Sequence, residues 1–259
     1  MDISLSDHGS SADSELAAGA TATRLCIFCN RSVEAWLPYY IRTSDLSPFL
    51  RELDCIGSNL ERFSCPHCSS SDRERHLRMF LGRMHIMEHV GGGAVLHMAP
   101  EAKLRGYIES FMLRTYIMGD LSPSSSDVQQ VDLEQIPFRD GTFDLVICNH
   151  MLEHVGDPFL ALREIHRVLK RGGRTICQTP YARRLSTTFE DPLLQSASDR
   201  LFFYGQEDHV RLFGSDIGRY FAEAGFIGRL VPHDEILPDV DPEQLGVNEK
   251  EPFFDFVRD

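Results

Sequence analysis

The sequence predicts an α/β protein that is built on a doubly wound, seven-stranded, mostly parallel sheet and carries a small N-terminal metal-binding module. Two observations support this prediction. From residue 94 onward, short apolar runs alternate with segments whose apolar residues recur at helical spacing. Before residue 72, two Cys-x-x-Cys pairs are separated by 35 residues, which is a pattern typical of metal-binding modules.

Length and composition limit the class of protein. With 259 residues and 42% hydrophobic residues, the chain can bury one large core and one small module. No run of about 18 apolar residues occurs, so no transmembrane helix is expected. Residues 1–23 are small, polar and acidic, without the basic start and apolar core of a secretory signal. We expect a disordered acidic tail there and a cytoplasmic location for the protein.

The net charge of −13 is concentrated at the two ends of the chain. Residues 1–23 contribute −4 and residues 234–259 contribute −7, which leaves −2 for the residues between them. The body therefore has no strong basic field, and this argues against nucleic acid as a partner.

The two cysteine pairs are Cys26 with Cys29 and Cys65 with Cys68. Each pair places two thiolates on one tight turn, and two such turns complete the tetrahedral four-sulfur site that Zn²⁺ favours. With four thiolates and no open position, the metal would be structural. A redox Cys-x-x-Cys or four unrelated thiols are the alternatives. The sequence predicts a zinc module over residues 24–71 that depends on the metal for its folding.

A linking helix is expected over residues 72–93. Ser71 and Glu74 form a capping-box pattern, and apolar residues follow at helical spacing as far as about residue 89. Three arginines, Arg73, Arg75 and Arg78, lie on this helix. They form either a solvated face, which the spacing favours, or a group that faces an anion.

The strands of the main domain, expected over residues 94–259, are short apolar runs that end in polar residues. Residues 143–148 read as a buried parallel strand, and Asn149 and His150 follow its carboxyl end. In open α/β sheets ligands bind at that edge. The other strands are expected over residues 94–98, 115–118, 128–131, 174–178, 226–231 and 252–257.

Helices are expected between these strands. Asp157 and Pro158 begin the clearest one, whose last turn holds Lys170 and which Gly172 ends. Further helices are expected over residues 101–112 and 215–224. Residues 181–210 form an insertion without clear periodicity, which follows the fifth strand and would lie over the mouth of the site.

Several short motifs between residues 94 and 231 together resemble the class I S-adenosylmethionine-dependent methyltransferases, most closely the type 11 subfamily. The paired cysteines followed by Ser-Ser-Asp-Arg-Glu-Arg resemble a zinc-containing branch of that family, as does the stretch over residues 205–211. The resemblance implies a Rossmann-like methyltransferase domain that binds S-adenosylmethionine. The motifs are the segments over residues 119–123, 132–138, 140–144, 152–154 and 167–173.

The resemblance also implies roles for individual residues. Asp120, with Leu121 after it, would accept hydrogen bonds from the ribose hydroxyls of the cofactor; a helix cap is the alternative role for Asp120. Asp132 would accept from the adenine amine, and the Leu133 amide would meet the ring. Asn149 would approach the methionine part, and His150 would line the floor of the site. His154 is either a site residue or a packed, hydrogen-bonded histidine.

One departure from the family concerns the first loop of the main domain. The family usually has Gly-x-Gly there, because the absent side chains let the backbone approach the cofactor. Here the stretch runs from His97 through Ala99 and Pro100 to Glu101. Glu101 either binds the α-amino group of the cofactor or is a helix-start acid that favours the macrodipole. We expect a rebuilt cofactor loop, with loss of cofactor binding as the alternative.

Methyl transfer needs a base only where the acceptor is protonated, and proximity supplies much of the rate. His209, in the insertion, is the candidate base, with His150 as a second catalytic candidate. Asp208, His209 and Arg211 could instead form a structural network. Because of the resemblance, we expect O- or N-methylation of a small-molecule or saccharide-type acceptor. A catalytically silent, zinc-bearing interaction module and an RNA methyltransferase remain alternatives, and oligomeric state is left open.

Overall fold

The computed structural model describes residues 24–259, and the acidic tail expected over residues 1–23 lies outside the described residues. Its main sheet has seven strands in the order β10-β11-β8-β7-β4-β5-β6. Pairing is parallel from β6 to β8, while β11 runs antiparallel to both of its neighbours. The predicted fold class is confirmed. The strands are β4 (Ala94–Met98), β5 (Thr115–Asp120), β6 (Gln129–Gln130), β7 (Phe143–Ile147), β8 (Leu169–Ile176), β10 (Phe226–Val231) and β11 (Phe253–Arg258).

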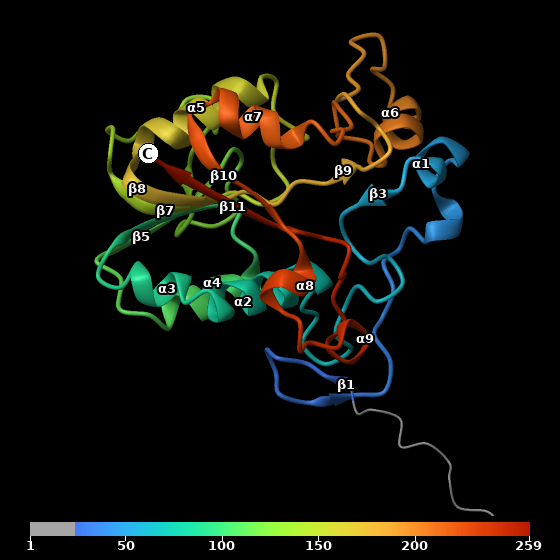
Figure 1. Cartoon of the computed structure of the whole chain (residues 1–259), viewed down its shortest axis with the longest axis horizontal. Coiled ribbons are helices and arrows are strands. Elements are labelled where there is room, and N and C mark those ends of the chain that lie inside the picture. The colour runs from blue at the N-terminus through green and yellow to red at the C-terminus, as the bar shows by residue number, and fades with distance from the viewer. Residues whose placement is uncertain (1–23) are drawn as a thin grey trace, which may run out of the picture.

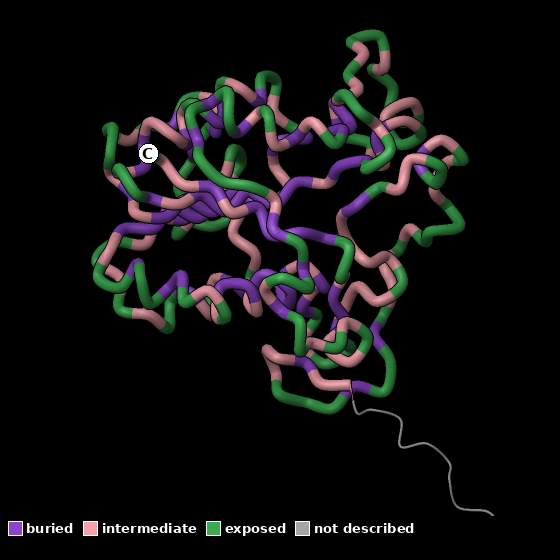
Figure 2. The backbone as a smooth tube through the Cα atoms, in the orientation of Figure 1, coloured by how far each residue is buried: buried purple, intermediate pink, exposed green. Residues whose placement is uncertain are grey.

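Helices cover both faces of this sheet (Figure 1). Successive side chains of a strand point to opposite faces, so each buried strand contributes to two cores. In β7, Leu145 and Ile147 pack with α2–α4, whereas Val146 between them packs with α5 and α7. An irregularity between Phe143 and Leu145 turns Phe143 to the same side as Val146. Figure 2 shows the sheet as the most continuously buried part of the fold. The helices are α2 (Asp72–Arg83), α3 (Ile86–His89), α4 (Ala102–Glu109), α5 (Pro158–Val168) and α7 (Ile217–Glu223).

The junction of α5 and β8 differs from the prediction. The predicted start is confirmed, because the Asp157 carboxylate accepts the Phe159 and Leu160 amides at 2.9 and 3.0 Å. The predicted end at Gly172 is wrong, since the helix stops at Val168 and β8 begins at once with Leu169. Leu169 is fully buried, and Lys170 donates to Asp144 of β7 at 2.6 Å. Packing and this ion pair hold the segment as a strand.

The expected linking helix is two helices. The Ser71 cap is confirmed, because its hydroxyl accepts the Glu74 amide at 3.2 Å while Glu74 accepts the Ser71 amide at 2.8 Å. His85 has φ 52°, a left-handed conformation that ends α2 and precedes α3. Leu77 and Phe80 of α2 are buried in the core under the sheet, so this helix forms part of the helical layer on that face.

The arginines of α2 are not a solvated face, so the favoured interpretation was wrong. Arg75 is fully buried, and its guanidinium carbon lies 4.0 Å from the centre of the Trp36 ring. It also donates to the Gly246 carbonyl at 2.6 Å. Arg78 lies over the Phe28 ring at 4.9 Å. Two of the three cations therefore join the cysteine-containing segment to the helical layer and the C-terminal segment.

The N-terminal region packs along the main domain at two places. Its hairpin β1 (Arg24–Leu25) and β2 (Ser32–Val33) lies beside α9 (Pro242–Leu245). Farther along, β3 (Cys55–Ile56) pairs antiparallel with β9 (Tyr181–Ala182) at the start of the insertion. Figure 1 shows α1 beside the insertion helix α6. The other elements are the short helix Thr43–Asp45, α1 (Pro48–Glu52), α6 (Ala197–Tyr204) and α8 (His233–Ile236).

Three further elements differ from the sequence prediction. The third strand is reduced to Gln129–Gln130, the insertion contains β9 and α6, and Asp216 instead of Ser215 precedes α7. Within residues 24–259, no helix has the length and the apolar character that crossing a membrane requires.

Candidate functional site

The carboxyl ends of the parallel strands bring the predicted residues to one edge of the sheet. Glu101 follows β4, Asp120 ends β5, Asn149 follows β7, and Gln178 follows β8. A small buried hollow at this edge is lined by Glu101, Asn149, His150 and Gln178, together with Arg73, Leu77 and Glu251. Asn149 and His150, which the edge rule for α/β sheets placed here, lie together with Glu101, which the family resemblance suggested.

The loop after β4 adopts the backbone conformation that glycine usually supplies. Ala99 has φ 43°, in the left-handed region, and its amide donates to the Gly119 carbonyl at 2.7 Å. A Cβ at Gly119 would lie 2.7 Å from the sulfur of Met98 and 3.0 Å from Cβ of Val131, so a larger residue there would force these side chains to shift. The loop is thus tightly turned although it lacks Gly-x-Gly.

Glu101 is the charged centre of this loop. Nε2 of His97 donates to Oε2 of Glu101 at 2.7 Å, and Nδ2 of Asn149 donates to Oε1 at 3.1 Å. His97 is fully buried, and its Nδ1 lies 2.8 Å from the Tyr116 hydroxyl. Burial alone would raise the pKa of Glu101. The hydrogen bond and charge of His97, with the hydrogen bond from the Asn149 amide, outweigh burial, so the pKa of Glu101 lies below its usual value. A carboxylate is therefore held ionised in a partly exposed position.

Asp120 and Asp132 each retain an oxygen that could bind a ligand. Asp120 accepts the Ser122 amide at 2.8 Å, and Asp132 accepts the Glu134 amide at 2.9 Å. The second oxygen of each has no hydrogen-bond partner among residues 24–259. Leu121 and Asp132 line a hollow of about 790 Å³ beside α5, while Leu133 is buried.

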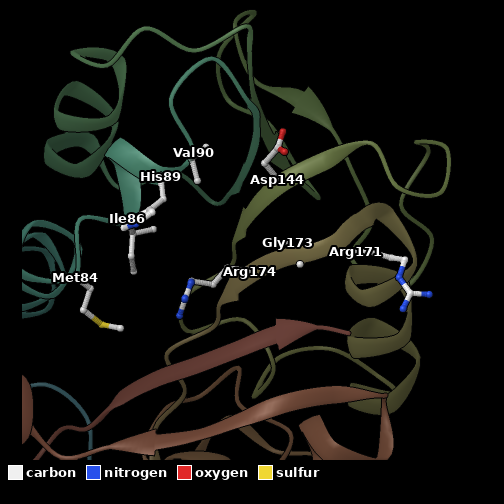
Figure 3. Close-up of a pocket in the computed structure, with 9 residues that line it drawn as sticks. Met84, Ile86, His89, Val90, Asp144, Arg171, Gly173 and Arg174 are labelled. Carbon is white, nitrogen blue, oxygen red and sulfur yellow. The ribbon is translucent and has the colours of Figure 1, made fainter.

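A separate hollow of about 340 Å³ lies at the opposite edge of the sheet (Figure 3). It is formed where the strands begin, between Val90, Asp144 and Arg174. Oδ2 of Asp144 accepts the Ala94 amide there at 2.7 Å. None of the predicted site residues lines this hollow, so it is not the site at the carboxyl edge.

Several buried ionisable groups surround His150. Its φ is 53°, its Nδ1 lies 3.7 Å from Glu153, and its Nε2 lies 4.0 Å from Glu251. Burial raises the pKa of Glu153 to about 8 and that of Glu251 to about 7. Burial, the positive charge of Arg73 and two nearby histidines hold the pKa of His150 well below its usual range. Arg73 makes no hydrogen bond or ion pair within the described part of the chain.

Sequence reasoning did not assign Arg73, Glu153, Gln178 or Glu251 to the site. Gln178 follows a strand directly, so the edge rule that found Asn149 would have found it. Arg73 and Glu153 lie inside motifs that the resemblance singled out. Glu251 carries no local signal, because only the antiparallel return of β11 brings it to this edge.

His209 is joined to the turn after β7 through the insertion. The Val210 amide donates to the Glu153 carbonyl at 2.9 Å. Arg211, 1% exposed, donates to the Leu152 carbonyl at 2.8 Å and to Glu190 at 2.9 Å. Arg211 thus fastens the insertion to the turn, as expected for a structural network. His209 itself is buried, and its pKa is lowered to about 4 by burial and the neighbouring His154.

A hollow of about 130 Å³ lies between the insertion and the N-terminal region. Leu50 and Ile56 form one side of it, and Tyr181, Tyr204 and His209 form the other. Most of its wall is apolar, with a few polar groups, as is usual in small-molecule sites. The pairing of β3 with β9 holds the two sides together.

The four predicted cysteines converge, which confirms their expected clustering. Their sulfurs all lie within 4.8 Å of one another, with Cys26 to Cys68 at 3.7 Å and Cys29 to Cys65 at 3.9 Å. Zn–S bonds of about 2.3 Å in a tetrahedron place sulfurs about 3.8 Å apart, so this set fits a zinc ion. Burial raises the pKa of Cys26, but hydrogen bonds, chiefly from Ser70, lower it to about 6. His67 is not part of the cluster.

Comparisons with known proteins find methyltransferases. A family model described as a methyltransferase domain matches residues 111–177. The chain is 36% identical over 83 residues to the uncharacterized methyltransferase YcgJ of Bacillus subtilis, covering 32% of this chain and 30% of the relative. It is 31% identical over 140 residues to the ubiquinone biosynthesis O-methyltransferase of Pseudomonas aeruginosa, covering 48% and 58%.

A C-methyltransferase of ubiquinone and menaquinone biosynthesis from Desulfotalea psychrophila is 40% identical over 65 residues, covering 24% of this chain and 26% of the relative. The crystal structure of YcgJ superposes with a TM-score of 0.41 and 22% identity, covering 58% of this chain and 69% of that one. The matches span less than two thirds of the length of these curated relatives.

Proposed function

We propose that this chain, which carries a class I S-adenosylmethionine-dependent methyltransferase domain, methylates an oxygen or nitrogen of a small-molecule or saccharide-type acceptor. When bound, S-adenosylmethionine supplies an electrophilic methyl group on a sulfonium. The protein has to bind and align the reactants, because proximity accounts for much of the rate of such a displacement.

The observation that carries the proposal is the ionised Glu101 carboxylate, held by His97 at 2.7 Å and Asn149 at 3.1 Å. It lies at the carboxyl edge of the sheet, where a cofactor ammonium group would need an anionic partner. The left-handed Ala99 supports a rebuilt loop and weakens the catalytically silent alternative. Asp120 and Asp132 would hold the ribose and adenine, with Leu121 and Leu133 beside them.

The acceptor would bind in the hollow between the insertion and the N-terminal region. Its apolar wall, with Tyr204 and His209 as polar groups, suits a compact, partly apolar molecule. We retain His150 as the residue that would take a proton from a protonated acceptor, because it lines the same hollow as Glu101 and Asn149. His209 is given a different role below.

A structural Zn²⁺ at Cys26, Cys29, Cys65 and Cys68 is also part of the proposal. The sulfur separations fit the ion, and Ser70 contacts Cys26 at 3.4 Å as an outer hydrogen-bond partner. We also propose a cytoplasmic location, because the seven cysteines form no disulfide and the cytosol keeps thiols reduced.

Isothermal titration of zinc-replete protein with S-adenosylmethionine and S-adenosylhomocysteine tests the cofactor part. We expect micromolar binding in the native protein and in Asp127→Ala, which alters an exposed carboxylate on the same loop. Asp120→Ala should weaken binding at least tenfold. Absence of binding by well-folded native protein would refute the enzyme and revive the alternative of a zinc-bearing interaction module.

A further inference from the structure

Three side chains next to the insertion form a cluster outside the cysteine site. Glu153 and His154 lie on the turn after β7, and His209 lies after α6. Each offers one ligand atom, and these atoms all lie within 4.8 Å of one another. The hydrogen bond from the Val210 amide to the Glu153 carbonyl joins the two segments.

His209 is oriented as a metal ligand would be. Its Nδ1 lies 3.0 Å from the Tyr204 carbonyl, which can only accept, so Nδ1 carries the proton. Nε2 is then left with a lone pair. This atom is buried in a side chain that is 5% exposed, and it has no hydrogen-bond partner among residues 24–259. Metal-bound histidines usually donate their other nitrogen to a carbonyl or carboxylate in this way.

His154 shows the same arrangement with a carboxylate. Its Nδ1 lies 3.3 Å from Oδ2 of Asp208, which leaves Nε2 to bind a ligand. The His154 and His209 rings meet edge to face with centres 4.7 Å apart. The two imidazoles therefore lie side by side, each with an outer oxygen partner on Nδ1.

Glu153 supplies the anionic member of the cluster. Its side chain is 2% exposed, and Oε2 has no hydrogen-bond partner within the described residues. Oε1 lies 3.7 Å from His150, on the side of the carboxylate that faces the cofactor edge. A buried carboxylate that lacks a partner on one oxygen is destabilised in its charged form, and a cation would stabilise it.

We propose that Glu153, His154 and His209 bind a divalent first-row transition-metal ion. Two imidazoles and one carboxylate are a ligand set that such ions accept, and three protein ligands leave positions open for water or substrate. Because His209 also lines the hollow of about 130 Å³, the ion would lie at the wall of the proposed acceptor site. In this arrangement Nε2 of His209 is bound and does not act as a base.

Mn²⁺ titration of the zinc-replete protein, followed by electron paramagnetic resonance, tests the site. The protein is loaded with one Zn²⁺ per chain, which the four cysteines hold, because excess Zn²⁺ would displace Mn²⁺ from the proposed site. Bound Mn²⁺ then reports a second site. We expect one Mn²⁺ per chain in the native protein and in His85→Gln, which replaces a histidine that is 69% exposed. Glu153→Gln and His209→Gln should weaken binding at least tenfold, as should Asp208→Asn through His154.

Nitrogen hyperfine coupling of the bound Mn²⁺ provides a readout that does not depend on the variants folding. Two coordinated imidazole nitrogens are expected in the native protein. No Mn²⁺ bound, no nitrogen coupling, or unchanged binding in folded Glu153→Gln and His209→Gln would each overturn the proposal. None of these measurements requires methyl transfer, so they fail or succeed independently of the proposed function.

Discussion

Oε2 of Glu101 and Nε2 of His97 lie 2.7 Å apart at the end of β4, and the imidazole is fully buried while the carboxylate remains partly exposed. The buried partner fixes the direction of the carboxylate, and Tyr116 fixes the imidazole in turn at 2.8 Å. The loop therefore presents an oriented negative charge at the carboxyl end of β4.

Replacing Glu101 with glutamine should weaken S-adenosylmethionine binding by about 10- to 100-fold, because one charge-assisted hydrogen bond is lost. Isothermal titration at neutral pH measures this. Glu109→Gln, on the same helix but exposed and paired with Arg105, is the matched control and should bind normally. Equal affinity of Glu101→Gln and native protein would exclude Glu101 as an ammonium ligand.

Gly246→Ala should destabilise the fold by about 2–5 kcal/mol, through overlap and backbone strain together. The residue has φ 62°, and a Cβ there would lie 2.7 Å from Nε1 of Trp36. Gly141 has φ 61°, but a Cβ there would meet no neighbouring atom. Gly141→Ala therefore measures the backbone strain alone and should lower the free energy of unfolding by about 1 kcal/mol. Urea denaturation compares the two, and equal losses would show that the Trp36 contact is not tight.

Loss of the proposed zinc ion should unfold the N-terminal region. Cys65→Ser is expected to lower the zinc content by one ion per chain. A loss of about 3 kcal/mol would lower the melting temperature by about 6–12 °C. Elemental analysis and calorimetry measure the two effects. Cys55→Ser, at an exposed cysteine outside the cluster, should change neither, and zinc retained by Cys65→Ser would refute the four-sulfur site.

His76 should make the protein less stable in acid. It is buried, its Nε2 lies 2.7 Å from Nδ1 of His233, and burial lowers its pKa to about 3. Above about pH 6.5 the histidine is neutral in both folded and unfolded chains. As the pH falls from 6.5 toward 3, only the unfolded chain takes up this proton, so stability falls by up to about 1.4 kcal/mol per pH unit.

His76→Gln should therefore flatten the pH dependence of the free energy of unfolding over that range. Glu251, whose pKa is raised to about 7 by burial, acts in the opposite sense but is present in both proteins. His85→Gln, at an exposed position, should reproduce the native curve. Parallel curves for His76→Gln and native protein would show that His76 is not the group responsible.

The sequence predicted the sheet well where local signals and tertiary packing agree. Apart from Asp144, the strand at residues 143–147 consists of buried apolar residues, so pattern and environment coincide. At residues 169–173 the local pattern and the tertiary environment conflict. Lys170 and Gly172 are typical of the end of a helix, but pairing with β7 holds the segment as a strand. α6 was missed because its apolar residues contact α1, a partner distant in sequence.

The site could be predicted to the extent that strand ends define it. Asp120 ends β5, and Glu101 and Asn149 lie within three residues of the ends of β4 and β7, so their shared edge followed from the parallel sheet. Arg73 reaches the same hollow from α2, which precedes the sheet in the chain. Glu251 reaches it from the residues just before β11, the last strand of the sheet. Such convergence depends on how distant segments pack, and no local spacing encodes it.

The pairing of β3 with β9 has a consequence for how this protein could diversify. Leu50 and Ile56 belong to a segment that precedes every strand of the main sheet, yet they line the hollow proposed for the acceptor. Substitutions in that segment would reshape the hollow proposed for the acceptor while every strand-end residue of the proposed cofactor site stays unchanged. Chimeras that exchange residues 43–60 between relatives are thus a direct route to altered acceptor selectivity.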